Sequence, residues 1–338
     1  DGKFMIGGDF TQVNGLFRDR LARLNADGTL DTTFDLGQGV DESVRAMTIQ
    51  PDGRAILAGF FTSVNGESRN RIARLNYDGS VDGTFNPGGG ADNPVHDVVL
   101  QSDGKVVIVG DFASYNGYNR SRVARLNNDG TLDKGFDNGT GADFVINSVA
   151  LQPDGKILVA GDFAHFNEEP LAGIARLNTD GSLDESFNPG GGFNDSVRLV
   201  GVQEDGRILV GGFFTEVNGV FRNRVARLMA DGSLDHSFDV GTGANGSVYS
   251  MDVQSDGKIL IGGSFSTFNN LNRNGIVRLS PDGSVDTTIN FGTGANGSVL
   301  DIVVLPNYKI LIGGGFTLFD GLEREYFAQL HGGIIDGR

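Results

Sequence analysis

The chain has 338 residues, a formal net charge of −16, 53 glycines, no cysteine and no tryptophan. An acidic protein of this kind repels nucleic acid and anionic membranes, and the lack of cysteine excludes disulfides and thiolate metal sites. No apolar run approaches the roughly 18 residues that a membrane-spanning helix needs, so we expect no membrane insertion.

The sequence is a single unit repeated along its whole length. An Asp-Gly-Lys or Asp-Gly-Arg tripeptide returns every 51 residues, and a degraded copy follows at Asn307. A fixed period of this length is typical of solenoids, propellers and arrays. The tripeptides begin at Asp1, Asp52, Asp103, Asp154, Asp205 and Asp256.

The unit 43–93 contains four short apolar runs and no helical periodicity. The runs SVRAMTIQ (43–50) and RAILAGFF (54–61) flank a Pro-Asp-Gly turn and predict a β-hairpin. RIARLN (71–76) and the shorter SVDGTF (80–85) follow. No window has apolar residues at the spacing of a helix face. The unit is therefore predicted to be a four-stranded antiparallel meander.

A glycine-rich connector (86–94) leads from each meander to the next. One meander cannot bury both of its faces, so neighbouring units must stack on it. Four-stranded sheets repeated in this way, with an outer-to-inner crossover between them, predict an all-β protein with the β-propeller fold. An open β-solenoid is the alternative, although its coils are usually much shorter.

The strand counts predict seven blades. Second strands recur seven times, from KFMIGGDF (3–10) to KILIGGGF (309–316), and third strands recur as often. First strands recur only six times, from SVRAMTIQ (43–50) to SVLDIVVL (298–305), so the first blade lacks its inner strand within the chain. We expect one propeller domain over 1–338 that comes from a larger protein, because the chain opens in mid-unit. Six blades plus a partial blade is the alternative.

Glycines and a phenylalanine close each second strand. Glycine weakens a strand unless another backbone approaches closely, so we expect crowding at pairs such as Gly211 and Gly212. The phenylalanines that follow are expected to fill the space between blades. They are Phe10, Phe61, Phe112, Phe163, Phe214, Phe265 and Phe316.

Two segments carry a family resemblance. QPDGKILVAGDF (Gln152–Phe163) and IARLNTDGSLDESFNPG (Ile174–Gly190) resemble the delta-sixty repeat family of bacterial β-propellers, and the resemblance covers the whole chain. It implies a propeller within a large secreted or surface-attached bacterial protein, often beside adhesin-like modules. It implies no catalytic residues.

The third strands are followed by the pattern Asn-x-Asp-Gly-x-x-Asp. Closely spaced carboxylates partly resemble a calcium loop, so calcium is the one cofactor that the sequence suggests. The full pattern of a calcium loop is absent. The favoured alternative is an Asx-type turn whose second aspartate accepts backbone N–H bonds or pairs with arginine. The carboxylates concerned are Asp27, Asp31, Asp78, Asp82, Asp129, Asp133, Asp180 and Asp184.

Two sets of arginines recur with the repeat. An arginine in each of six third strands is predicted to form a structural ion pair with the turn carboxylates. These arginines are Arg23, Arg74, Arg125, Arg176, Arg227 and Arg278. An Arg-x-Arg pair in the preceding loop could form a basic arc for an anionic glycan or a carboxylate-rich partner. The alternative is a solvated loop whose arginines pair with a neighbouring blade.

One position near the start of the first strand varies between copies, while the positions two and four further on stay apolar. Packing alone therefore does not dictate the residue there, and in a propeller it would lie at one rim of the central channel. We predict a site for a small polar ligand, with a water-filled channel mouth as the alternative. The candidate ligand-binding residues are Arg45, His96, Asn147, Arg198 and Tyr249, with Asp97 and Asp301 directly after the variable position.

No catalytic motif with a defensible spacing is present. The sequence predicts a non-enzymatic binding or scaffold module of a bacterial secreted or cell-surface, adhesin-like protein. Its partner would be a protein or a glycan that meets loops on one rim. One alternative is a structural subunit of a self-assembling extracellular appendage or particle. Another is a propeller hydrolase or lyase with its site at the channel mouth.

Overall fold

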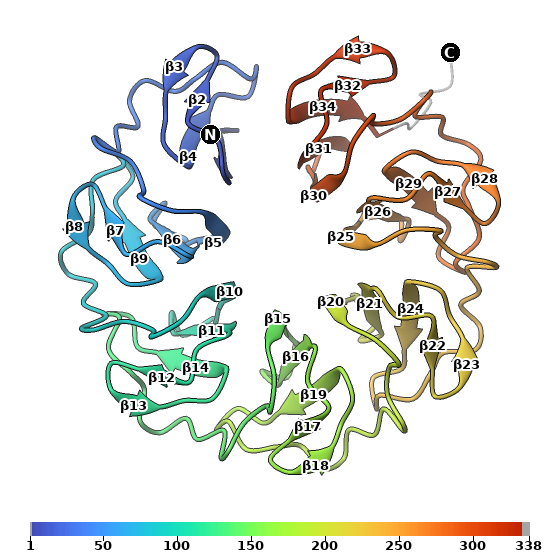
Figure 1. Cartoon of the computed structure of the whole chain (residues 1–338), viewed down its shortest axis with the longest axis horizontal. Coiled ribbons are helices and arrows are strands. Elements are labelled where there is room, and N and C mark those ends of the chain that lie inside the picture. The colour runs from blue at the N-terminus through green and yellow to red at the C-terminus, as the bar shows by residue number, and fades with distance from the viewer. Residues whose placement is uncertain (1, 333–338) are drawn as a thin grey trace. The chain divides into compact units, whose positions relative to one another are not determined.

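The computed structural model describes residues 2–332. Asp1, which opens the first tripeptide, lies outside the described residues. Every regular element in the described range is a β-strand, and no helix there could span a membrane. The prediction of an all-β, multi-blade propeller is confirmed by this repeated architecture (Figure 1).

The strands fall into four sets. First strands are β5 (Val44–Ile49), β10 (Val95–Leu100), β15 (Ile146–Leu151), β20 (Val197–Val202), β25 (Val248–Val253) and β30 (Val299–Val304). Second strands are β1 (Phe4–Gly7), β6 (Ala55–Gly59), β11 (Val106–Gly110), β16 (Ile157–Gly161), β21 (Ile208–Gly212), β26 (Ile259–Gly263) and β31 (Lys309–Gly314). Third strands are β4 (Leu21–Leu24), β9 (Ile72–Leu75), β14 (Val123–Leu126), β19 (Ile174–Leu177), β24 (Val225–Leu228), β29 (Ile276–Leu279) and β34 (Phe327–His331).

The fourth set consists of two-residue strands in the loops between second and third strands. They are β2 (Gln12–Val13), β3 (Leu16–Phe17), β7 (Ser63–Val64), β8 (Glu67–Ser68), β12 (Ser114–Tyr115), β13 (Tyr118–Asn119), β17 (His165–Phe166), β18 (Glu169–Pro170), β22 (Glu216–Val217), β23 (Val220–Phe221), β27 (Thr267–Phe268), β28 (Leu271–Asn272), β32 (Leu318–Phe319) and β33 (Leu322–Glu323). These short strands were not predicted from the sequence. In the second blade Asn65 (φ 50°) and Gly66 (φ 75°) both adopt the left-handed conformation, which suits the tight turn of a two-residue hairpin.

Each blade is built on an antiparallel sheet in the order first, second, third strand. Within residues 2–332 six such sheets have all three strands, and the first blade has only β1 and β4. In the described part of the chain the first blade thus has no first strand, as the repeat count predicted. The predicted fourth strand is much shorter than expected. It pairs with the third strand through a single β-bridge, such as that between Leu75 and Val81.

A β-bulge interrupts the pairing of first and second strands. In the fifth blade Val197 lies opposite Gly212 and Leu199 opposite Gly211, so Arg198 is an extra residue on β20. A Cβ atom on Gly212 would lie 2.3 Å from the carbonyl oxygen of Ser196. The close approach of two backbones that the glycine pairs predicted is therefore confirmed at this strand end.

The chain folds as two compact units. Among the described residues, unit 1 contains 2–159, 163–169 and 176–184, and unit 2 contains 160–162, 170–175 and 185–332. The division falls within the fourth blade. A single domain over 1–338 stays a prediction.

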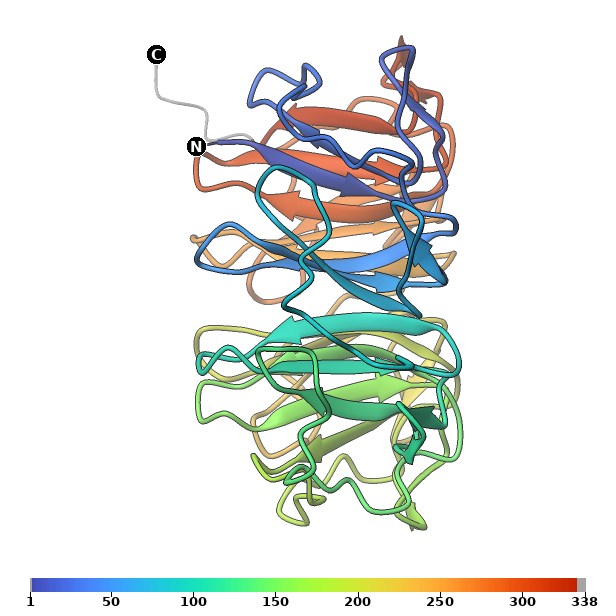
Figure 2. The ribbon, with the colours of Figure 1, turned by 90° about the vertical axis from the view of Figure 1, so that its left-hand side faces the viewer.

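The hydrophobic core lies between successive blades. In unit 1, Phe112 of the third blade packs in one buried cluster with Ile56 and Phe85 of the second blade, and the strands of these blades run side by side (Figure 2). In unit 2, Phe265 of the sixth blade packs with Leu209 and others of the fifth. The predicted filling between blades is confirmed for Phe61, Phe112, Phe265 and Phe316, whereas Phe10 is only half-buried. Each fully buried side chain contributes roughly 1.5–3 kcal/mol.

Candidate functional site

Each blade that has a first strand has two chemically different ends. The "turn end" carries the turn between first and second strands (50–54 in the second blade) and the turn after the third strand (76–80). The "hairpin end" carries the bulge, the two-residue hairpin and the connector. The two candidate sites of the molecule lie at these opposite ends.

The variable position predicted to bind a ligand is the bulged residue of the first strand. In the second blade Val44 lies opposite Gly59 and Ala46 opposite Ala58, so Arg45 is the extra residue. The same irregularity occurs at His96, Arg198, Tyr249 and Leu300. A bulge re-aims its side chain and removes it from the alternation of the strand, which explains why packing leaves this residue free to vary.

In unit 1 two of the predicted residues meet on one aromatic ring. The guanidinium carbon of Arg45 lies 5.4 Å from the centroid of the Phe60 ring. The imidazole of His96, from the next blade, stacks on the same phenylalanine at 5.9 Å with 28° between the planes. Nη1 of Arg71 donates a hydrogen bond to the carbonyl oxygen of Phe60. We call Arg45, Phe60 and His96 the Phe60 cluster.

Unit 2 repeats this arrangement three blades later. The guanidinium carbon of Arg198 lies 5.3 Å from the Phe213 centroid, and Tyr249 meets the same ring edge-on at 6.1 Å. The hydroxyl of Ser264 lies 3.4 Å from that of Tyr249. The sequence did not identify Phe60 or Phe213 as site residues, although both occupy a position that is Asp111, Asp162 or Ser264 in other copies.

The predicted carboxylates belong to links between first strands. Oδ2 of Asp97 accepts hydrogen bonds from the hydroxyl of Ser148 (3.1 Å) and the N–H of Val149 (2.9 Å). Oδ1 of Asp301 accepts hydrogen bonds from the hydroxyl of Ser250 and the N–H of Ile302. Asn147, the bulge candidate of the fourth blade, is buried. None of these three residues belongs to the Phe60 cluster.

The environment of Asp301 disfavours its charge. Surrounding protein atoms, and then the negative charge of Asp252, raise the pKa of Asp301, although part of the side chain is exposed to solvent. Burial likewise raises the pKa of Asp252, whose Oδ2 accepts a 2.7 Å bond from the N–H of Val304. These carboxylates act as acceptors for the neighbouring strand.

At the turn end, the predicted ion pair is confirmed. Nε of Arg74 lies 2.7 Å from Oδ2 of Asp82, and Nη1 of Arg54 lies 2.8 Å from the same oxygen. Burial alone would raise the pKa of Asp82, but hydrogen bonds from Thr84 and the two arginines hold that pKa well below its ordinary value. The same pairs recur at Arg23–Asp31, Arg125–Asp133, Arg176–Asp184, Arg227–Asp235 and Arg278–Asp286.

The first aspartate of each turn forms the predicted Asx-type turn. Oδ1 of Asp78 accepts hydrogen bonds from the N–H (2.9 Å) and the hydroxyl (2.6 Å) of Ser80. Asp27, Asp129 and Asp180 make the same pair of bonds. In residues 2–332 no group of three or more His, Asp or Glu side chains is placed to hold a metal ion. The geometry therefore favours the turn over the calcium loop.

The Arg-x-Arg loops are tied to their own hairpins. Nη1 of Arg69 donates to the carbonyl oxygen of Ser68, and Arg71 (φ 67°) donates to that of Phe60. The expected pairing with a neighbouring blade is thus wrong for these two arginines.

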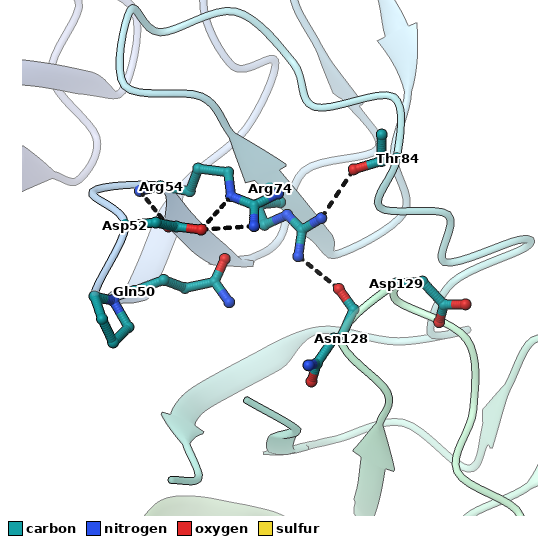
Figure 3. A pocket seen from close by; sticks show the side chains of 8 residues that line it. Gln50, Asp52, Arg54, Arg74, Thr84, Asn128 and Asp129 are labelled. Carbon is teal, nitrogen blue, oxygen red and sulfur yellow. Dashed lines mark hydrogen bonds and ion pairs between the residues drawn. The ribbon is translucent and has the colours of Figure 1, made fainter. Parts of the chain in front are cut away.

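A cavity of about 490 Å³ opens at the turn end of unit 1 (Figure 3). Residues of two successive blades line it. They are Gln50, Pro51, Asp52, Arg54, Arg74, Thr84, Asn128 and Asp129. The repeat pattern did not predict this cavity. One signal was available, because the residue between Asn and Asp in the turn pattern varies as much as the bulge residue does.

Comparisons with solved structures show the fold. The chain is similar to the WD40 β-propeller domain of Doa1 (16% identity, TM-score 0.60), covering 93% of this chain and 86% of that one. It is similar to the extracellular domain of a one-component system from B. thetaiotaomicron (15%, 0.57), covering 92% of this chain and 37% of that one. A third is virginiamycin B lyase from Staphylococcus aureus (14%, 0.51), with coverage of 80% and 76%. At these identities the likeness concerns architecture alone.

No curated protein matches the sequence. The family described as "Domain of unknown function (DUF5122) beta-propeller" matches residues 1–34, 50–85, 101–136, 152–187, 203–238 and 254–288. Each matched segment after the first begins at the turn between first and second strands, and four of these five segments end at the phenylalanine of the fourth segment. The matches cover more than half of the chain, and the protein therefore belongs to the DUF5122 β-propeller repeat family.

Proposed function

We propose that the protein is a non-enzymatic binding module whose hairpin end takes carboxylate groups of a protein or glycan at the Phe60 cluster. One observation carries the proposal. Arg45 is exposed, and within residues 2–332 its guanidinium makes no hydrogen bond or ion pair, only the contact with Phe60. An arginine that packs on an aromatic ring still has its guanidinium N–H groups available for a bidentate hydrogen bond to a carboxylate.

The surroundings support a positive site on an acidic protein. Arg71 adds a second positive charge beside Phe60, and the cation–π contact between Arg45 and the Phe60 ring contributes about 0.5–1 kcal/mol to holding the Arg45 guanidinium in place. The net charge of −16 repels acidic partners elsewhere, so a local basic site would set where they bind.

The setting is part of the proposal. The repeat motif resembles the delta-sixty type, which implies a bacterial secreted or cell-surface protein. The likeness to an extracellular domain is compatible with that location. Self-assembly and a hydrolase or lyase activity remain alternative predictions.

Calorimetry with a deca-glutamate peptide and with tri-galacturonate tests the proposal and separates its two sources of carboxylate. Arg45→Gln should weaken the binding of either probe about 10- to 100-fold, because a hydrogen bond to a charged group contributes about 1.5–3 kcal/mol. Arg120→Gln is the matched control, since Nη1 of Arg120 is bonded to its own hairpin at Asn119. Equal affinity in the wild type and the Arg45 variant, or binding of neither probe, contradicts the proposal.

A further inference from the structure

The cavity at the turn end is built by two blades. The turn between β5 and β6 supplies Gln50 and Asp52, β9 supplies Arg74, and the turn after β14 supplies Asn128 and Asp129. Figure 3 shows the side chain of Gln50 beside Asp52, extending from its own turn toward Asn128. This site is at the opposite end of the blade from the Phe60 cluster.

Gln50 has an unused acceptor inside the protein. The residue is 8% exposed, and its Oε1 makes no hydrogen bond with any described residue. The equivalent oxygens of Gln152 and Gln254 accept from Arg176 and Arg278 at 3.4 and 3.2 Å. A buried polar atom is normally paired, so an unpaired acceptor at the wall of a cavity is available to a donor group that enters the cavity. Gln101 and Gln203 also have an unpaired Oε1, but both are only half-buried.

The charges that line the cavity are already balanced. Nε and Nη2 of Arg54 bind Asp52, and its Nη1 binds Asp82. The guanidinium of Arg74 donates to Asp82, to the carbonyl oxygen of Asn128 and to Thr84. An anion would find no free arginine fork here and would face two carboxylates. A cation would lie beside two guanidinium groups. The site therefore favours a neutral ligand.

The polar atoms that line the cavity and are not used in hydrogen bonds within the protein are mostly acceptors. Besides Oε1 of Gln50, Asp129 has a second carboxylate oxygen, since only its Oδ1 is used by Thr131. Asn128 is exposed and makes one long side-chain bond, from Nδ2 to the carbonyl oxygen of Asp103 at 3.4 Å. Pro51 adds an apolar surface. Hydroxyl groups donate to such acceptors, and the C–H face of a sugar ring packs on an apolar wall.

We propose that this cavity binds a neutral polyhydroxylated ligand, a sugar residue, through the amides of Gln50 and Asn128 and the carboxylate of Asp129. A volume of about 490 Å³ lies in the range of small-molecule sites. The junction is chemically distinct among the repeats, because the position of Asn128 is Tyr77, Thr179, Ala230 or Pro281 elsewhere. Tyr77 lies over the guanidinium of Arg23 at 4.2 Å, where it covers the corresponding arginine.

Saturation-transfer NMR and calorimetry with glucose, galactose, mannose and N-acetylglucosamine test the proposal. We expect at least one of these neutral sugars to bind, and its charged analogue, glucuronate or glucosamine, to bind more weakly. Gln50→Met should weaken that binding at least about tenfold without lowering the melting temperature, because it removes an acceptor that has no partner in the folded protein. Asn128→Ala should weaken it as well.

Gln203→Met is the matched control, since it removes the equivalent amide from another blade. It should leave sugar binding unchanged. The proposal is overturned if none of the four sugars binds, if a charged analogue binds more tightly, or if the Gln50 and Gln203 variants behave alike. Arg45→Gln should have no effect on this site, so loss of the carboxylate site and loss of the sugar site are distinguishable.

Discussion

Nη1 of Arg74 donates a 2.5 Å hydrogen bond to the carbonyl oxygen of Asn128, a residue of the next blade. The same guanidinium holds Asp82 of its own blade through Nε. One buried side chain thus joins a carboxylate, a hydroxyl and the main chain of the following repeat. Arg23, Arg125 and Arg227 make the equivalent bond to Tyr77, Thr179 and Pro281.

Removal of one of these arginines should destabilise the protein strongly. Arg227 is 2% exposed, and Arg227→Met leaves Asp235 buried and short of a partner. We expect a loss of about 3–5 kcal/mol, measured by chemical denaturation, whereas the double variant Arg227→Met/Asp235→Leu should recover much of it. A single variant as stable as the wild type would show that the pair contributes nothing to the junction.

The turn carboxylates should make the protein sensitive to acid. The pKa values of Asp235 and Asp286 are lowered to about 2, since hydrogen bonds to their charged forms outweigh the effect of burial. A carboxyl with a depressed folded-state pKa contributes stability above its unfolded pKa of about 3.9, and this is lost as pH falls through the folded value. The melting temperature should therefore fall between about pH 4 and pH 2. Asp235→Asn should lower stability at pH 7 and reduce this dependence; an unchanged acid profile would contradict the assignment.

Replacement of the glycine at the end of the second strand should destabilise the protein. Gly212→Ala places a Cβ 2.3 Å from the carbonyl oxygen of Ser196, so the bulge must shift. The expected cost is about 1–3 kcal/mol. Gly201→Ala, in the same blade, meets nothing within 4 Å and should be neutral in the same thermal melts. Equal melting temperatures for the two variants would argue against close backbone contact at the bulge.

The sequence predicted those features that depend on short spacings within one repeat. Asp78 and Ser80 are two residues apart, and Arg74 and Asp82 eight, so turn and ion pair follow from local chemistry and strand length. The bulge at Arg45 was not predictable, because it depends on the register between β5 and β6 and on how closely Gly59 approaches. The single-bridge fourth strand likewise depends on pairing with the third strand.

The sites were predictable only in part. Variation at Arg45 and His96 indicated a site, but their meeting on Phe60 requires two blades to be placed side by side. The cavity joins Gln50 to Asn128, which come from different repeats. Local structural propensity gives no information about which residues of different repeats meet. The variability of the turn position did, however, indicate that Asn128, one of the residues lining the cavity, could have a special role.

The bond from Arg74 to Asn128 goes to a main-chain oxygen, which every amino acid supplies. A duplicated blade inserted after an existing one would meet the same acceptor whatever side chain its turn carried. Mutation can then change the side chain at this turn position, from tyrosine to asparagine to proline, without weakening the hydrogen bond between the blades. This bond is thus compatible with duplication of the repeat, while each new copy acquires its own surface side chains.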